Sequence, residues 1–180
     1  MSPTRTFARP TRGRQEHGQS LAEFAIVAVP LLLLLLGIVQ FALLYNAQIG
    51  LTNAVRDVAR YGSTLVANQD GSAGTSAGLA ASFLQTSLGT YITPYSAAAK
   101  GAGTQACYDD YVDSDGVNAA RITVTAVYNH PLIVPLIGNI IDAFAGTSDG
   151  AYRITVTADL RVDNPPDPVP AITGPICVPA

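Results

Sequence analysis

One segment constrains the fold more than any other, a long uncharged stretch near the N-terminus. From Phe24 to Leu44 there are 21 residues without a charged side chain, and Leu31 to Leu36 are all leucine. At 1.5 Å per residue, a helix of this length spans ~31 Å, close to the ~30 Å hydrocarbon core of a bilayer. A soluble domain rarely covers every face of so long a helix with protein. We therefore expect a single transmembrane helix.

The charges on either side of this segment predict its direction. Residues 1–18 carry four arginines and Glu16, a net charge of +3, whereas the remainder carries 6 basic and 12 acidic side chains. Because positive flanking charge stays in the cytoplasm, we expect a cytoplasmic N-terminus and an exported C-terminal part. Nothing after the leader supplies the concentrated basic surface that nucleic acid requires, so no nucleic-acid partner is predicted.

A glycine ends the basic leader, and a lone carboxylate follows at the edge of the apolar segment. Cleavage after Gly18 would give Gln19 a positive α-amino group, which could pair with Glu23 of a neighbouring subunit. Without cleavage, Glu23 would lie in the headgroup region, because a carboxylate is costly only deeper in the bilayer. The chemistry of these residues leaves both interpretations open.

Three stretches of this region have a distinctive combined pattern. They are Gly18–Ala25, the run from Pro30 through the leucines to Phe41, and Leu51–Gly62 with its Asn-Ala-x-Arg-x-x-Ala-Arg-Tyr sequence. Together they resemble the TadE-like (TadE/TadG-type) family of the tight-adherence (Flp) pilus assembly system. The resemblance covers about 45 residues, and the part after the apolar run is its most specific element.

The resemblance implies a pseudopilin-like, single-pass protein of the bacterial inner membrane, without a catalytic role or a cofactor. A prepilin-type peptidase would cut between Gly18 and Gln19, so that Glu23 becomes the fifth residue of the mature chain. Other pilin-like subunits of a pilus assembly complex would be its partners. The alternative is a membrane-tethered extracytoplasmic binding module that keeps its leader. The residues predicted to contact other subunits are Glu23, Phe24, Arg56 and Arg60.

The helix is predicted to continue beyond the membrane as a single element from Ser20 to about Ala67. Its polar side chains after the span, Asn53, Arg56, Asp57 and Arg60, lie on the side opposite an apolar stripe. Three- and four-residue steps of this kind are typical of an amphipathic helix that covers a domain. The apolar stripe comprises Leu51, Ala54, Val55, Val58, Ala59, Gly62, Leu65 and Val66.

The rest of the exported part predicts a small α+β head of pilin-like architecture. We expect a loop up to Gly78, then a short helix that ends at Gly89 and places Leu79, Phe83, Leu84 and Leu88 on one face. Arg-Ile-Thr-Val-Thr-Ala occurs twice, at 121–126 and 153–158, and its alternation predicts neighbouring antiparallel strands against which the long helix packs. The predicted organisation is a leader over 1–18, a transmembrane helix over 19–45, a head over 46–164 and a Pro-rich tail over 165–180.

An apolar segment from Pro131 to Phe144 separates the two predicted strands. Its large side chains recur at helical spacing, but about 14 residues are too few to span a bilayer. Two interpretations remain open, packing over the sheet or a patch that touches the membrane or another subunit. The apolar side chains are Ile133, Leu136, Ile137, Ile140, Ile141 and Phe144.

Both cysteines, Cys107 and Cys177, lie in the exported part, where a pair most often forms a disulfide. A bridge across ~70 residues is worth about 4 kcal/mol in the chain-entropy model and would fix the Pro-rich tail to the head. Free thiols or an intermolecular bridge are the alternatives.

Two further patterns suggest chemistry but are not supported by their context. The acidic residues Asp109, Asp110, Asp113 and Asp115 fail the EF-hand spacing, so we expect a solvated turn and no metal site. Gly74-Thr75-Ser76-Ala77-Gly78 has the letters of a nucleophile elbow but lies in a predicted loop, and His130 is the only exported histidine. We therefore predict no catalytic residues and no enzymatic activity.

Overall fold

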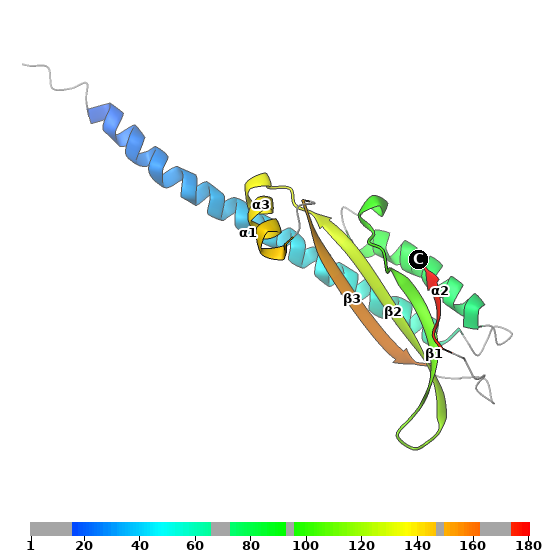
Figure 1. The fold of residues 1–180 in the computed structure, drawn as a ribbon. Helices are drawn as coiled ribbons and strands as arrows, with labels where there is room; N and C mark the ends of the chain where they lie inside the picture. The colour runs from blue at the N-terminus through cyan, green and yellow to red at the C-terminus, as the bar shows by residue number, and fades with distance from the viewer. Residues whose placement is uncertain (1–15, 66–72, 93–95, 147–149, 163–173) are drawn as a thin grey trace, which may run out of the picture. The chain divides into compact units, whose positions relative to one another are not determined.

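The computed structural model describes residues 16–65, 73–92, 96–146, 150–162 and 174–180. The elements run in the order α1 (Glu16–Ser63), α2 (Ala73–Tyr91), η2 (Ala97–Ala99), β1 (Gln105–Val112), β2 (Asn118–Pro131), α3 (Pro135–Ala145), β3 (Ala151–Arg161) and β4 (Ile176–Pro179). Figure 1 shows their arrangement. By contacts the chain divides into two units, residues 1–39 and 40–180. The second unit is called the head below.

The head is built on a four-stranded antiparallel sheet with the order β3-β2-β1-β4. The two copies of the repeated hexapeptide pair directly, with Val124 opposite Ala158 and Ala126 opposite Val156. Because alternate side chains share a face, this register joins the two predicted apolar faces into one. The prediction of neighbouring antiparallel strands in an α+β, pilin-like head is confirmed.

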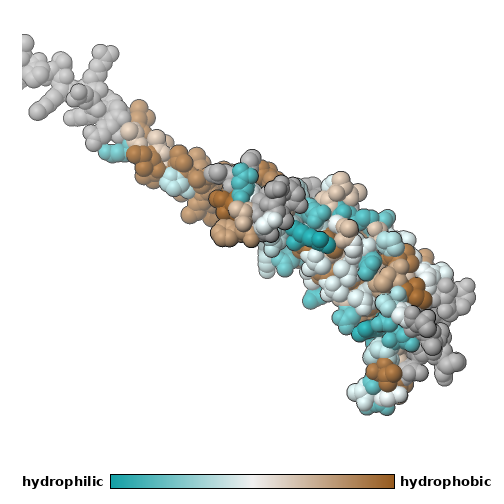
Figure 2. Space-filling model, in the orientation of Figure 1, coloured by the Kyte–Doolittle hydropathy of each residue, from teal (hydrophilic) through white to brown (hydrophobic). Residues whose placement is uncertain are grey.

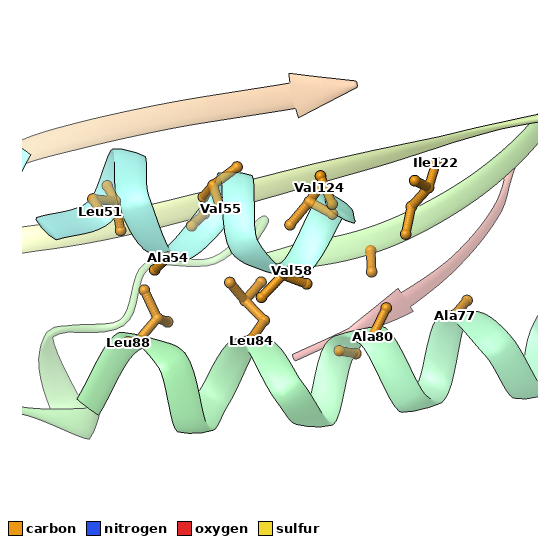
Figure 3. Close-up of a cluster of buried hydrophobic side chains, with 14 of the residues drawn as sticks. Leu51, Ala54, Val55, Val58, Ala77, Ala80, Leu84, Leu88, Ile122 and Val124 are labelled. Atoms are coloured by element: carbon orange, nitrogen blue, oxygen red, sulfur yellow. The ribbon is translucent and has the colours of Figure 1, made fainter. Parts of the chain in front are cut away.

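The core lies between this sheet face and helices α1 and α2 (Figure 3). In Figure 3, Ala54 and Val58 of α1 face Leu88 and Leu84 of α2, with strands of the sheet close by. The apolar stripe predicted for α1 is buried at each of its described positions from Leu51 to Leu65. The polar residues that alternate with it are exposed, as the helical period requires.

Glycines let these helices approach closely. A Cβ atom added at Gly50 of α1 would lie 2.3 Å from the backbone oxygen of Tyr91, at the end of α2. At Gly62 an added Cβ would lie 2.0 Å from Ile122 Cδ1, on the sheet. Backbone at the end of α2 therefore leaves room only for glycine at position 50, whereas at position 62 a larger residue would require the Ile122 side chain to move.

The structure corrects the prediction for α2. This helix begins at Ala73, so residues 73–78 are helical rather than a loop, and it runs past Gly89 to Tyr91. Propensity does not favour a helix here, because residues 73–78 hold as many glycines as alanines, but the burial of Ser76 and Ala77 in the core overrides it. Of the residues predicted to share one face, Leu84 and Leu88 are buried but Leu79 is exposed. Small residues form much of the buried face, namely Ser76, Ala77, Ala80, Ala81 and Ser87.

The sheet is also larger than predicted, because β1 and β4 were not expected as strands. Asp109 and Asp110 lie in β1, and the turn of the hairpin comprises only the residues from Asp113 to Val117. The predicted helix end near Ala67 is also corrected, because α1 ends at Ser63. Val66 and most of the predicted tail lie outside the described residues.

Candidate assembly surface on helix α1

The N-terminal part of α1 is apolar and exposed along its length. In the first unit, Phe24 is 71% exposed and Leu34 59% exposed. Ser20–Ser63 is the one stretch, among the described residues, that is helical, long and apolar enough to cross a membrane. Figure 2 shows hydrophobic surface along this part of α1 and a more polar surface on the head. An exposed apolar helix of this kind suggests a single-pass membrane anchor.

A polar side chain marks the point where α1 enters the head. Gln40 is fully buried, and its Oε1 accepts hydrogen bonds from the backbone N–H groups of Ile133 and Val134, at 3.0 and 3.3 Å. These donors lie immediately before α3, where a helix start leaves N–H groups without intrahelical partners. The Gln40 carboxamide therefore connects α1 to the start of α3.

Beyond Gln40, α1 presents a polar face to solvent. Arg56 and Arg60 are exposed, and neither guanidinium forms a salt bridge with another described residue. Arg60 lines a groove of about 530 Å³ between α1, α2 and β3, and Arg161 lies on the same groove. Arg56 lines a smaller depression of about 290 Å³ with Tyr45 and other α1 residues.

The one acidic residue of this face has a partner inside the head. Tyr91 Oη donates a hydrogen bond of 2.7 Å to Asp57 Oδ2, which joins the end of α2 to α1. This hydrogen bond and the negative charge of Asp57 raise the pKa of Tyr91. Asp57 is thus engaged within the chain, while the two arginines remain available to bind an acidic group.

The described part of α1 therefore combines an exposed apolar helix, an exposed carboxylate at Glu23 and two exposed arginines on its polar face. Residues 18–60 match the TadE-like protein family. The resemblance predicted from the sequence is confirmed over these residues. No curated protein and no solved structure matches the chain.

The TadE-like match contains all the predicted processing and contact residues. Gly18 and Gln19 lie within α1, and Glu23 and Phe24 follow on the same helix. Arg56 and Arg60 lie near the other end of the match. Their roles in cleavage and in subunit contact stay predictions.

The two cysteines are joined across the edge of the sheet. Cys107 and Cys177 stand opposite each other in β1 and β4 and form a disulfide, with their Cα atoms 4.0 Å apart. The bridge predicted from the sequence is thus present. It attaches the C-terminal strand directly to the sheet, in addition to the backbone pairing of β4 with β1.

The acidic residues near the hairpin have structural partners. Asp113 Oδ1 accepts hydrogen bonds from the N–H groups of Asp115 and Val117, an arrangement that stabilises tight turns. Asp109 forms a 2.9 Å salt bridge with Arg121 on the neighbouring strand, which raises the pKa of Arg121. In the described part of the chain, no group of three or more His, Cys, Asp or Glu side chains could hold a metal ion.

The serine and histidine that an esterase would need are both buried, at separate places. Ser76 lies fully buried in α2, and His130 lies at the far end of β2 with both ring nitrogens lacking hydrogen-bond partners among the described residues. Burial lowers the pKa of His130. Neither side chain is open to a substrate.

Sequence reasoning missed Gln40, although a signal for it was present. It is the only amide side chain in an apolar stretch of 21 residues, where an unpaired amide is costly. Its partners are two backbone N–H groups more than ninety residues later. The side chains of those residues give no indication of the contact.

Proposed function

We propose that this protein is a membrane-anchored, pseudopilin-like subunit that acts in the assembly or anchoring of a Tad-type (Flp) pilus or a related secretion apparatus. The observation that carries the proposal is the TadE-like match, which begins at Gly18, the predicted processing residue. The match favours this role over the alternative, a tethered extracytoplasmic binding module, because the TadE-like family is pilus-related.

The proposed topology places the N-terminus in the cytoplasm and the head outside the inner membrane. The arginines of the leader support this direction, since positive flanking charge is retained inside. The Cys107–Cys177 disulfide supports it independently, because such bridges persist in oxidising compartments outside the cytoplasm.

In this proposal a prepilin-type peptidase removes residues 1–18, and the new α-amino group of Gln19 pairs with Glu23 of an adjacent subunit. Such a pair would offset the cost of a carboxylate at the membrane edge. Glu23, Phe24, Arg56 and Arg60 then lie along one helix as contacts for other pilin-like subunits.

The test is the N-terminal residue of the protein purified from its native membrane, measured by intact mass. The processed protein is expected to begin at Gln19, and a Gly18→Val variant is expected to keep its leader. A Glu23→Ala variant separates cleavage from assembly, because it should be cleaved but fail to associate. A wild-type chain that begins at Met1 or Ser2 would contradict the proposal and favour the tethered module.

A further inference from the structure

Helix α3 is apolar on both its inner and its outer side. Gly138 is buried and Ile137 is half-buried, so one side of the helix packs on the head. On the outer side, Ile140 is 53% exposed and Phe144 is 90% exposed. These two residues are four positions apart and therefore share a face of the helix. Ile133, just before the helix, is 64% exposed as well.

The sequence of α3 carries almost no charge. Asp142 is its only charged residue, and it contains no lysine or arginine. A solvent-exposed helix face is usually covered by charged side chains, so the exposed Ile140 and Phe144 suit an apolar environment better than water.

The hydrogen bonds to Gln40 determine the position along α1 at which α3 begins. The uncharged stretch begins at Phe24, and about 20 helical residues cross the hydrocarbon core, so its outer boundary falls near Leu43. Gln40 lies less than one helical turn before that residue. Because its Oε1 binds the N–H groups of Ile133 and Val134, the start of α3 is held at this boundary.

Two tyrosines lie at the same end of the head. Tyr152 is 43% exposed and stands opposite His130, one residue from the end of β2. Tyr45 is 66% exposed, and both tyrosines line a groove of about 500 Å³ together with Phe41. Tyrosine is enriched where a membrane protein crosses the boundary between lipid and water.

We propose that α3 is an interfacial helix whose outer face lies in the extracytoplasmic headgroup region of the bilayer. Ile133, Ile140 and Phe144 form its lipid-facing surface, and Tyr45 and Tyr152 complete a membrane-facing rim of the head. This inference rests on α1 crossing the membrane, but it does not require a role in pilus assembly.

The bilayer fits this surface better than a second protein chain. Gln40, which holds the start of α3, belongs to the same uncharged stretch of α1 that is proposed to cross the bilayer. Interfacial helices gain affinity from buried apolar area and, where they are basic, from anionic lipids. Since α3 has no basic residue, zwitterionic lipid should be sufficient.

The chain contains no tryptophan, so a single introduced tryptophan reports on its own surroundings. The test uses the full chain in phosphatidylcholine vesicles with a fraction of lipid brominated along the acyl chains, which quenches tryptophan on contact. Phe144→Trp probes α3. Leu34→Trp is the positive control in the span, and Val117→Trp, at the opposite end of the sheet and 54% exposed, is the negative control.

Phe144→Trp is expected to emit at shorter wavelength than Val117→Trp and to be quenched at least about twofold more strongly. Quenching no stronger than that of Val117→Trp overturns the interfacial helix, whether the residue lies in water or against another protein chain. If Leu34→Trp is nevertheless quenched, α1 still crosses the membrane and only the proposal for α3 is wrong. If Leu34→Trp also escapes quenching, the anchor itself is wrong, and the inference falls with it.

Discussion

The Oε1 atom of Gln40 lies 3.0 Å from the backbone nitrogen of Ile133, so a side chain of the apolar helix accepts a hydrogen bond from the segment that starts α3. Val134 donates to the same oxygen. Both hydrogen bonds are part-buried, and each contributes about 0.5–1.5 kcal/mol net, so one carboxamide supplies two such contributions. The position of α3 therefore depends on a residue that lies more than ninety positions earlier in the sequence.

Replacing Gln40 by alanine should destabilise the head by about 1–3 kcal/mol, because it removes the acceptor of both N–H groups. Hydrogen exchange should accelerate at Ile133 and Val134 while the amides of β1 keep their protection. Gln48→Ala, an exposed change on the same helix, is the control and should have little effect. Equal loss of protection across the whole head would show that Gln40 acts on global stability rather than on α3.

Removing the disulfide should release the C-terminal strand. The Cys107→Ala/Cys177→Ala variant is expected to lose up to about 4 kcal/mol of unfolding free energy, because the bridge closes a loop of 70 residues. The measurement is urea unfolding of the oxidised protein, the reduced protein and the variant. An unchanged midpoint on reduction would mean that the strand pairing alone holds β4 to β1.

Two glycine substitutions should have opposite effects on stability. Gly50→Ala places a methyl group 2.3 Å from the Tyr91 backbone oxygen, which cannot move without shifting the end of α2, so a loss of about 1–3 kcal/mol is expected. Gly78→Ala meets no atom within 4 Å and replaces a helical glycine, so a gain of about 0.5–1 kcal/mol is expected. Thermal unfolding of the two variants beside the wild type compares them directly.

The stability of the head should fall in mildly acidic solution because of His130. Burial lowers its pKa in the folded state below the ordinary value of 6.5, so below pH 6.5 the unfolded chain binds the proton more readily. The contribution of His130 to the free energy of unfolding is therefore complete above pH 6.5 and decreases as the pH falls through that value. Its ring neighbours the tyrosine Tyr128, with centroids 6.1 Å apart, and stands opposite Tyr152.

His130→Phe should remove this pH dependence without breaking a hydrogen bond among the described residues, since neither ring nitrogen has a partner there. The comparison is urea unfolding at pH 7.5 and 5.5, with the leader that contains His17 removed from both proteins. A wild-type head that is equally stable at the two pH values would contradict the predicted shift.

Periodicity predicted the parts of the fold that have one buried face. The stripe on α1 and the repeated hexapeptide in β2 and β3 were predictable because a helix and a half-buried strand repeat their apolar residues at 3.6 and 2.0 residues. Strand β1 was not predictable, because Asp109 and Asp110 interrupt its alternation of apolar and polar residues. The strand tolerates them because Arg121 on the neighbouring strand pairs with Asp109. β4 pairs with the edge of β1 and is joined to it through Cys177, contacts that its own Pro-rich sequence does not indicate.

Only part of the candidate assembly surface could be predicted from the sequence. The exposure of Arg56 and Arg60 followed from the helical period, but the engagement of Asp57 by Tyr91 did not, since it depends on where α2 ends. The role of Gln40 depends likewise on a contact between distant segments. Such long-range contacts leave no local pattern in a single sequence.

The two exposed arginines of α1 should act in association rather than in folding. An Arg56→Glu/Arg60→Glu variant reverses two charges that form no salt bridge with a described residue, so only the helix-end effect at Arg60 is lost and the unfolding free energy should stay within about 1 kcal/mol of the wild type. If these arginines bind acidic groups on other subunits, the reversed charges will repel them. We therefore expect loss of chemical crosslinking to other pilin-like subunits in the native membrane.

A control variant adds negative charge elsewhere on the head, changing the net charge by about half as much as the arginine variant does. Gln85→Glu/Thr90→Glu places two carboxylates on the exposed face of α2 and should leave the crosslinks intact. Crosslinks that survive the arginine variant would exclude this part of α1 from the interface and restrict subunit contacts to Glu23, Phe24 and the membrane span. Loss of crosslinks in both variants would instead show that added negative charge anywhere on the head opposes assembly, because the effect would not depend on which helix carries it.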